Sequence, residues 1–305
     1  MNNKILLIAG DPRSINSEII FKTWKKLSIN SKKKIYLIGN YELITKQLKI
    51  LKYKLKTIKL KRLNDKIDGK NLNIIDIPLK FKNPFDVLEK YSSEYVMKSL
   101  RLAHKLAVKK KVKGIVNCPI DKKLLRGSKK IGVTEFFASK CKIFDKSEVM
   151  LIHNKNFSVV PLTTHIRIKD VAKKINKKLI LNKIFSLNKN FKILFKKKPK
   201  IGILGLNPHN GELAKSSEEI NLLKPAILRL KKEGVSISGP LIADTLFIKE
   251  FKKYDVIVGM YHDQVLTPFK TLYKFDAINI TLGLKYLRVS PDHGTAVNLI
   301  GKNLA

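Results

Sequence analysis

Short apolar runs alternate with longer, lysine-rich amphipathic segments along most of the chain. Residues 4–9 and 34–39 are apolar enough for buried strands, and helix-like segments through residue 26 and over 41–51 follow them. This alternation of strand and helix predicts an α/β fold with a parallel sheet. The same reading gives a helix over 84–110, a strand over 112–117 and helical structure over 168–199.

Two stretches depart from this simple alternation. Residues 52–85 are rich in lysine and show no clear period, so they are expected to be irregular. Ser216-Ser217-Glu218-Glu219 resembles a capping box that opens a helix, and Pro225 is expected to kink or restart that helix.

Three apolar runs each end on a histidine. The stretch 255–270 contains Val-Ile-Val followed by His262 and Asp263, and the runs over 157–165 and 200–209 end on His165 and His209. Buried parallel strands have this apolar character, and such sheets bind ligands beyond the carboxyl ends of their strands. We therefore expect the three imidazoles to lie at one edge of a sheet.

Three imidazoles at one edge would suit a divalent metal ion. Histidine is a common ligand for such ions, and three protein ligands leave coordination positions open for a substrate. A histidine after a strand is also common as a capping or packing residue, so spacing alone leaves both readings open.

The net charge bears on possible partners. The chain of 305 residues carries 63 Lys and Arg against 24 Asp and Glu, which gives a formal charge of +39. Nearly all of the excess is lysine, and no recognised nucleic-acid module is present, so we expect no nucleic-acid partner. The charge would still raise the local concentration of anionic small molecules.

The remaining composition indicates a folded protein of the cytoplasm. Its hydrophobic content of 44% excludes wholesale disorder, and the two cysteines, Cys118 and Cys141, are too few for a disulfide framework. The apolar run near the amino terminus is too short for a signal peptide and is expected to be a strand. No apolar stretch reaches the roughly 18 residues that a membrane span needs.

Several polar groups could bind an anionic substrate. Thr134 and Glu135 stand at an expected helix start, where backbone N–H groups favour an anion. Arg288, Lys270 and Asn279 add hydrogen-bond donors, two of them cationic. Neither a GxGxxG fingerprint nor a Walker-type loop occurs, so the usual Rossmann and P-loop sites are not supported.

Seven motifs resemble the 4-hydroxythreonine-4-phosphate dehydrogenase (PdxA) family. In chain order they are VNCPIDK (116–122), GVTEFFA (132–138), LTTHI (162–166), LNPHNGE (206–212), GPLIADTLF (239–247), MYHDQ (260–264) and NITLGLKYLRVSPDHGTA (279–296).

The resemblance implies a two-lobed isocitrate/isopropylmalate-dehydrogenase-like α/β fold with mostly parallel sheets, an interlobe active-site cleft and a homodimer. We expect residues 1–125 with 270–305 to form the first lobe and 126–269 the second. It also implies oxidation of 4-phosphooxy-L-threonine at C3 with NAD or NADP, followed by loss of CO2, with Zn2+, Mg2+ or Co2+ in the site.

The resemblance assigns roles to individual residues. The implied metal ligands are His165, His209 and His262, and Asp263 is expected to support them. The implied substrate contacts are Thr134, Lys270, Asn279 and Arg288. The loop of His293, Gly294, Thr295 and Ala296 is implied to bind the adenosine part of the cofactor.

The chain departs from the family pattern at several places, two of which are residue 133 and residues 10–18. Val133 stands where the family has histidine in Gly-His-Thr-Glu, and residues 10–18 read GDPRSINSE where the family has a sequence like GEPAGIGPE. These changes leave open a related four-carbon substrate, 4-phosphothreonate or erythronate phosphate, and a catalytically degenerate binding paralogue. Binding of nucleic acid through the lysine surplus is a third alternative.

Overall fold

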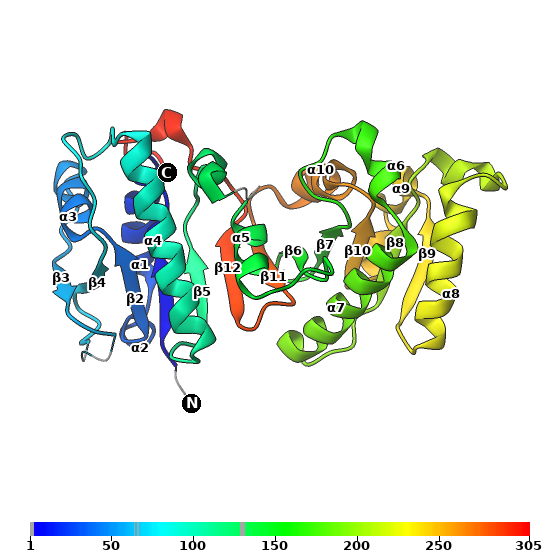
Figure 1. Cartoon of the computed structure of the whole chain (residues 1–305), viewed down its shortest axis with the longest axis horizontal. Coiled ribbons are helices and arrows are strands. Elements are labelled where there is room, and N and C mark those ends of the chain that lie inside the picture. The colour runs from blue at the N-terminus through cyan, green and yellow to red at the C-terminus, as the bar shows by residue number, and fades with distance from the viewer. Residues whose placement is uncertain (1–2, 64, 66, 129–131) are drawn as a thin grey trace. The chain divides into compact units, whose positions relative to one another are not determined.

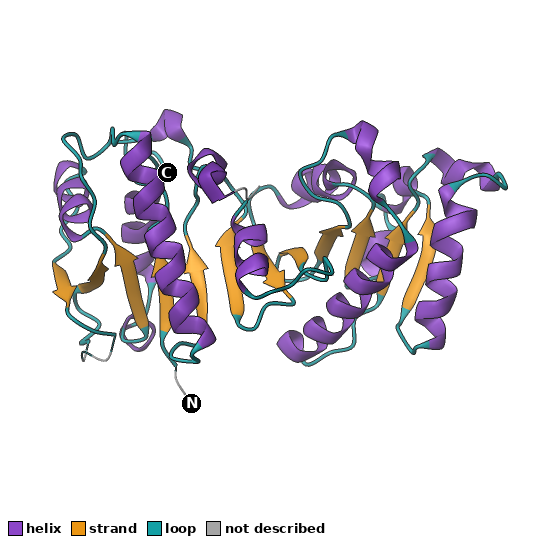
Figure 2. Cartoon of the chain, viewed as in Figure 1, coloured by secondary structure: helices purple, strands orange, loops and turns teal. Residues whose placement is uncertain are grey.

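The computed structural model describes residues 3–63, 65, 67–128 and 132–305. The chain divides into two units, which are described separately (Figure 1). Unit 1 comprises Met1–Lys140 and Lys285–Ala305, and unit 2 comprises Cys141–Leu284. Both combine helices with a mostly parallel sheet (Figure 2), which confirms the predicted α/β class.

The elements of unit 1 follow the expected alternation. The strands are β1 (Ile5–Ile8), β2 (Ile35–Gly39), β3 (Thr57–Leu60), β4 (Leu72–Asp76), β5 (Gly114–Asn117) and β12 (Leu287–Pro291). The helices are α1 (Asn16–Lys26), α2 (Ile29–Lys32), α3 (Tyr41–Ile50), α4 (Glu89–Val108) and α5 (Val133–Lys140). The strands lie side by side in the order β3-β4-β2-β1-β5-β12, and each pair is parallel.

The order of these strands reverses at β1. The chain moves from β1 to β2 in one direction and later returns to place β5 on the other side of β1. Because parallel crossovers are right-handed, this reversal puts α1 and α3 on one face and α4 on the other; α4 crosses in front of the sheet in Figure 1. The carboxyl ends of β1 and β5 therefore form a topological switch point, the usual ligand-binding position in such sheets.

The expectation of irregular structure over 52–85 was wrong, because β3 and β4 lie there. In β3, Thr57 and Leu60 are buried whereas Lys59 is exposed, and an ion pair of 2.7 Å joins its Nζ to Asp76 at the end of β4. The exposed lysines in and around this short edge strand hide its apolar positions.

The elements of unit 2 surround a mixed sheet. Its strands are β6 (Val149–His153), β7 (Ser158–Pro161), β8 (Ile201–Leu204), β9 (Ile237–Leu241), β10 (Val256–Gly259) and β11 (Ile278–Leu282). Its helices are α6 (Val171–Lys174), α7 (Lys177–Phe195), α8 (Lys224–Lys232), α9 (Ala243–Leu246) and α10 (His262–Tyr273). The order is β11-β6-β7-β10-β8-β9, and β6 is antiparallel to both of its neighbours.

Strand β10 lies inside this sheet, as its apolar sequence predicted. Ile257 pairs with Val159 on one side and Gly202 on the other, both in parallel. Beneath the strand, Val265 and Phe269 of α10 join Ile257 in the apolar core of the unit.

The unit borders, 140/141 and 284/285, lie later in the chain than the expected 125/126 and 269/270. Helix α5 stays with unit 1 because Phe137 packs edge-on against Tyr286, with ring centroids 6.0 Å apart. Strand β11 stays with unit 2 because it pairs with β6.

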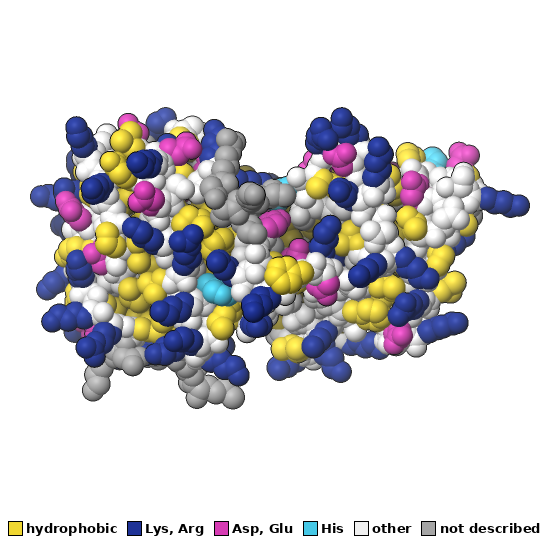
Figure 3. Space-filling view, in the orientation of Figure 1, with side chains coloured by type: hydrophobic (Ala, Val, Ile, Leu, Met, Phe, Trp, Pro, Cys, Tyr) yellow, Lys and Arg dark blue, Asp and Glu magenta, His cyan; other side chains and the backbone are white. Residues whose placement is uncertain are grey.

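Lys and Arg side chains are spread over the visible surface of both units (Figure 3). Within the described residues, none of the helices combines the length and apolar character needed to cross a membrane.

Candidate active site

The three predicted histidines follow three neighbouring strands of unit 2. His165 follows β7, His262 follows β10 and His209 follows β8, and β10 pairs in parallel with both of the other strands. The expected adjacency of the three strand ends is therefore present in the sheet.

His165 and His262 lie together. Their ring centroids are 5.5 Å apart, and His165 adopts a left-handed backbone conformation with φ of +52°. The loop before His165 is tied to the end of β10, because the Thr163 hydroxyl donates to the carbonyl oxygen of Met260 at 2.7 Å. The backbone N–H of Leu162 donates to the Gly259 carbonyl at 2.7 Å as well. These bonds fix the position from which the His165 side chain leaves the backbone.

Gln264 connects the ends of two strands. Its Oε1 accepts from the backbone N–H of Met260 at 2.7 Å, and its Nε2 donates to the carbonyl oxygen of Gly205 at 2.8 Å. One side chain at the start of α10 therefore joins the end of β10 to the loop after β8, which carries His209.

Asp263 lies in hydrogen-bonding contact with His262. The Asp263 Oδ1 and His262 Nδ1 atoms are 2.7 Å apart. If the imidazole donates from Nδ1, its Nε2 lone pair is available to a ligand, which is how carboxylates commonly orient metal-binding histidines.

His209 lies apart from this pair in the structure. Its Nε2 is 3.5 Å from Asp244 Oδ2, and its side chain is 65% exposed. The backbone from His209 to Glu212 is left-handed at every residue, with φ between 46° and 60°. Over residues 3–63, 65, 67–128 and 132–305, no group of three His, Cys, Asp or Glu side chains is close enough to hold a metal ion.

The loop that carries His209 is organised by Glu219, which sequence reasoning assigned to a capping box. The Glu219 side chain is fully buried, and its Oε1 accepts from the backbone N–H groups of Leu206 and Asn207 at 2.8 Å each. Burial alone raises the pKa of Glu219, but the hydrogen bonds from Asn207 and Leu206 outweigh it, and the pKa is lowered.

The predicted substrate residues of unit 1 contact each other. Arg288 is 3% exposed, its Nε donates to Asn117 Oδ1 at 2.7 Å, and its Nη1 donates to the Thr134 hydroxyl at 3.3 Å. Burial lowers the pKa of Arg288 to about 10, so the guanidinium stays charged at neutral pH.

The other two predicted substrate residues belong to unit 2. Lys270 lies on α10 with Nζ 5.6 Å from the centroid of the Phe275 ring. Asn279 lies on β11, and its Oδ1 is buried without a hydrogen-bond partner among the described residues. A buried unsatisfied oxygen costs about 1–3 kcal/mol, which a bound donor group would recover.

The predicted cofactor loop lies on the surface of unit 1. His293 and Gly294 are exposed, and the His293 Nδ1 atom is 2.9 Å from the Gly294 carbonyl oxygen. The Thr295 carbonyl accepts from the backbone N–H of Ile15 at 3.3 Å, so the loop contacts the segment that follows β1.

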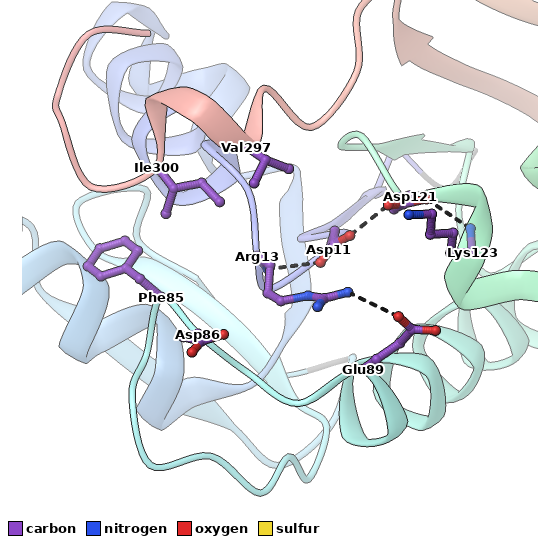
Figure 4. Close-up of a pocket in the computed structure, with 9 residues that line it drawn as sticks. All are labelled: Asp11, Arg13, Phe85, Asp86, Glu89, Asp121, Lys123, Val297 and Ile300. Atoms are coloured by element: carbon purple, nitrogen blue, oxygen red, sulfur yellow. Dashed lines mark hydrogen bonds and ion pairs between the residues drawn. The ribbon is translucent and has the colours of Figure 1, made fainter.

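A cavity of about 330 Å3 opens beside this loop (Figure 4). Its lining residues are Asp11, Arg13, Phe85, Asp86, Glu89, Asp121, Lys123, Val297 and Ile300. Sequence reasoning did not find this cavity. The cavity could have been predicted from its position after β1 and β5, but that position can be recognised only once the strand order is known.

Comparisons with known proteins agree on one family. The family model of pyridoxal phosphate biosynthetic protein PdxA matches residues 31–305. A 4-hydroxythreonine-4-phosphate dehydrogenase of Sulfurihydrogenibium sp. (strain YO3AOP1) is 37% identical and covers 99% of this chain and 93% of its own length. A putative D-threonate 4-phosphate dehydrogenase of Oceanobacillus iheyensis is 32% identical over 97% of this chain and 91% of the relative.

The comparison with a solved structure agrees with this family. The crystal structure of 4-hydroxythreonine-4-phosphate dehydrogenase from Klebsiella pneumoniae superposes with a TM-score of 0.86 at 28% identity, covering 99% of this chain and 94% of that one. Motifs, family model, full-length relatives and fold therefore lead to one conclusion: the chain belongs to the PdxA family of pyridoxal phosphate biosynthetic proteins.

Proposed function

We propose that this protein is a metal-dependent 4-hydroxythreonine-4-phosphate dehydrogenase of pyridoxal 5'-phosphate biosynthesis. The substrate C3–H bond breaks as its hydride passes to NAD+ or NADP+, and the C3 hydroxyl loses its proton. The resulting β-keto acid loses CO2 and takes up a proton to give 3-amino-2-oxopropyl phosphate. Membership of the PdxA family is the observation that carries this proposal.

The proposed metal ligands are His165, His209 and His262. Three observations support this fit: the imidazoles follow adjacent strands, two of the rings lie 5.5 Å apart, and Asp263 contacts His262. His209 is exposed, so its side chain can change rotamer at small cost. When bound, a Zn2+, Mg2+ or Co2+ ion would supply Lewis acidity toward the substrate oxygens.

The proposed role of the cationic groups is to bind and orient the substrate anions. Arg288 offers a charged, forked donor that Asn117 and Thr134 hold in place, and Lys270 adds a second charge. Asn279 contributes the buried Oδ1 that needs a donor. Fixing the substrate at these points presents its C3–H bond to the nicotinamide, which accepts the hydride.

The proposed cofactor residues are His293, Gly294, Thr295 and Ala296. Exposure of this loop and its contact with the segment after β1 support the assignment. We also propose that the enzyme works as a homodimer in the cytoplasm.

The decisive experiment follows NADH or NADPH formation from 4-phosphooxy-L-threonine by the purified protein. We expect turnover that a chelator abolishes and that added Zn2+, Mg2+ or Co2+ restores. Lack of turnover with every metal would contradict the proposal. Thermal stabilisation by substrate without turnover would instead identify a binding paralogue.

A second substrate has a specific observation in its favour. Val133 begins α5, next to Thr134, and cannot supply the hydrogen bond of the histidine that the family pattern has there. A relative named as a putative D-threonate 4-phosphate dehydrogenase shares 32% identity with this chain. Comparing kcat/KM for 4-phosphooxy-L-threonine with kcat/KM for 4-phosphothreonate and erythronate phosphate separates these substrates.

A further inference from the structure

The side chain of Arg288 extends from β12 to the end of β5. Arg288 pairs in register with Ile115, and Asn117 lies two residues further along β5, on the same face of the sheet. Asn117 and Arg288 are 2% and 3% exposed, and their side chains are joined by the bond of 2.7 Å from Nε to Oδ1. Water therefore does not compete for this hydrogen bond, and two paired strands fix its direction.

The Asn117 side chain is itself held in one orientation. Its Nδ2 donates to the Cys118 carbonyl oxygen at 3.0 Å, which leaves Oδ1 to face Arg288. The backbone around it is equally constrained, because β5 pairs with β1 on one side and β12 on the other. The backbone N–H of Cys118 extends the pairing by donating to the Ile8 carbonyl oxygen at 2.9 Å. Asn117 is thus a rigid support for the guanidinium.

The acceptor that Asn117 presents to Arg288 is a neutral amide. Burial lowers the pKa of Arg288 to about 10, whereas Glu135 and Tyr286 raise it, so the guanidinium keeps its charge at neutral pH. Bonds from Nε to Asn117 and from Nη1 to Thr134 fix the guanidinium plane at two points. Because neither of these two acceptors carries a charge, both orient the cation without reducing its attraction for an anion.

We propose that Asn117 is a positioning residue for substrate binding, an inference that rests on the proposed dehydrogenase function. It fixes the plane of the Arg288 guanidinium and leaves the positive charge to the anionic group of the substrate. A carboxylate at position 117 would fix the same plane, but its negative charge would lie within hydrogen-bonding distance of the cation and offset it. The neutrality of the amide, as well as its hydrogen bond, therefore determines how strongly Arg288 attracts the substrate.

The test compares two substitutions that separate the hydrogen bond from the charge. Asn117→Ala removes the acceptor and leaves the cation, and we expect 4-phosphothreonate to bind about tenfold more weakly. Asn117→Asp keeps an acceptor for Nε but offsets the cation, and we expect binding at least about 100-fold weaker. Both variants lose the donor to Cys118, so that loss does not distinguish them.

A merely structural role for Asn117 predicts the reverse order, since aspartate still accepts from Nε. Isothermal titration calorimetry of the full chain with Mg2+, at about 0.15 M salt, gives the affinities. NAD and NADP are left out, so no hydride is transferred. An aspartate variant that binds as tightly as the alanine variant, or more tightly, would overturn the proposal. Failure of 4-phosphothreonate to bind the unmodified chain would do so as well.

Asn30→Asp is the charge-matched control, because Asn30 is exposed on α2. This variant changes the net charge by the same amount, and its affinity should stay within about twofold of the unmodified chain. A loss in the control equal to that in Asn117→Asp would assign the effect to net charge and overturn the proposal.

A double-mutant cycle tests whether Asn117 acts through Arg288. In an Arg288→Lys background, Asn117→Ala should weaken binding by less than about twofold further, because the guanidinium that Asn117 positions is gone. A further loss of about tenfold would mean that the two residues act independently and would overturn the proposal. The cycle does not use the aspartate variant, so it decides the proposal even where the buried carboxylate prevents folding.

Failure of the proposed reaction is distinguishable from failure of this inference. The expected order of affinities without oxidation of any tested substrate would remove the proposed function and leave the positioning role. Turnover that Asn117→Asp leaves unchanged would retain the dehydrogenase and remove the positioning role.

Discussion

The buried carboxylate of Glu219 holds Asn207 by two hydrogen bonds. Oε1 accepts from the Asn207 backbone N–H at 2.8 Å, and Oε2 accepts from the Asn207 side-chain Nδ2 at 3.0 Å. Asn207 lies two residues before His209. The buried Glu219 carboxylate therefore positions the backbone that carries His209, a proposed metal ligand. The strained left-handed turn that follows depends on this support.

Replacing Glu219 by Gln should lower the free energy of unfolding by about 1–3 kcal/mol, because the amide presents a donor where the carboxylate accepts. Urea denaturation at neutral pH measures the change. Glu233→Gln is the control, because Glu233 is exposed and directly follows α8, and this variant should stay within about 0.5 kcal/mol of the unmodified chain. A Glu219→Gln variant as stable as the control would contradict the positioning role.

The same variant should show a defined pH dependence. The pKa of Glu219 is lowered in the folded protein, so its contribution is present above its ordinary value of 4.5 and is lost as the pH falls through the folded pKa. The stability difference between the unmodified chain and Glu219→Gln should therefore shrink on acidification below that value. A difference that grows in acid would be inconsistent with the lowered pKa.

Asp11 should have the opposite effect on the pH dependence of stability. Burial raises the pKa of Asp11 from 3.8 to about 6, although hydrogen bonds from Arg13 and Asp121 oppose the shift. The folded protein therefore takes up a proton that the unfolded chain does not bind between these two values. Relative to Asp11→Asn, the unmodified chain should gain up to about 3 kcal/mol as the pH falls from above 6 toward 4. Denaturation midpoints of both proteins are measured across this pH range. If the midpoints of the two proteins change in parallel with pH, the raised pKa of Asp11 is refuted.

The metal proposal predicts a loss of bound ion without a loss of fold. His209→Ala and His262→Ala should each reduce retained Zn2+ after dialysis from near one ion per chain to about a tenth of that or less. Because the His209 side chain is 65% exposed, its removal should change the free energy of unfolding by only about 0.5 kcal/mol. Elemental analysis and chemical denaturation supply the two readouts, and full retention of zinc in both variants would exclude these ligands.

Arg288→Lys keeps the charge but not the forked donor. Lysine cannot donate to both Asn117 and Thr134 from the same position, so we expect kcat/KM for 4-phosphooxy-L-threonine to fall at least about 100-fold. Arg229→Lys is the matched control, since Arg229 is exposed on α8. Steady-state kinetics of the two variants measure this effect. Equal changes in kcat/KM for both variants would argue against substrate binding by Arg288.

Val133→His tests the substrate alternative. Restoring an imidazole at the first residue of α5 should raise kcat/KM for 4-phosphooxy-L-threonine relative to 4-phosphothreonate by roughly tenfold, which is the value of one hydrogen bond. An unchanged ratio would mean that the residue at this position does not choose between the two substrates.

The buried strands and their polar ends could be predicted from the sequence because burial on both faces leaves a continuous apolar run. Val256–Gly259 is such a run, and His262 lies beyond its carboxyl end as expected. Strands β3 and β4 were missed because lysines surround the short edge strand β3 and because the polar residues Asn73 and Asp76 interrupt the apolar run of β4.

The contacts that organise the site could not be predicted, since they depend on pairings far apart in the sequence. Asp11 and Asp121 are brought together only by the pairing of β1 with β5. The hydrogen bond from the Glu219 carboxylate to the N–H of Leu206 likewise requires the chain to return over the loop after β8. A capping-box pattern at Ser216-Ser217-Glu218-Glu219 gives no hint of that return.

The pairing of β12 with β5 has a consequence for synthesis on the ribosome. Strand β5 ends at Asn117, but its second neighbour begins only at Leu287, after all of unit 2 has been translated. The nascent amino-terminal sheet therefore carries an open hydrogen-bonding edge throughout the elongation of the inserted unit. During that interval the exposed edge of β5 most needs a chaperone to cover it, or unit 2 to fold rapidly on its own.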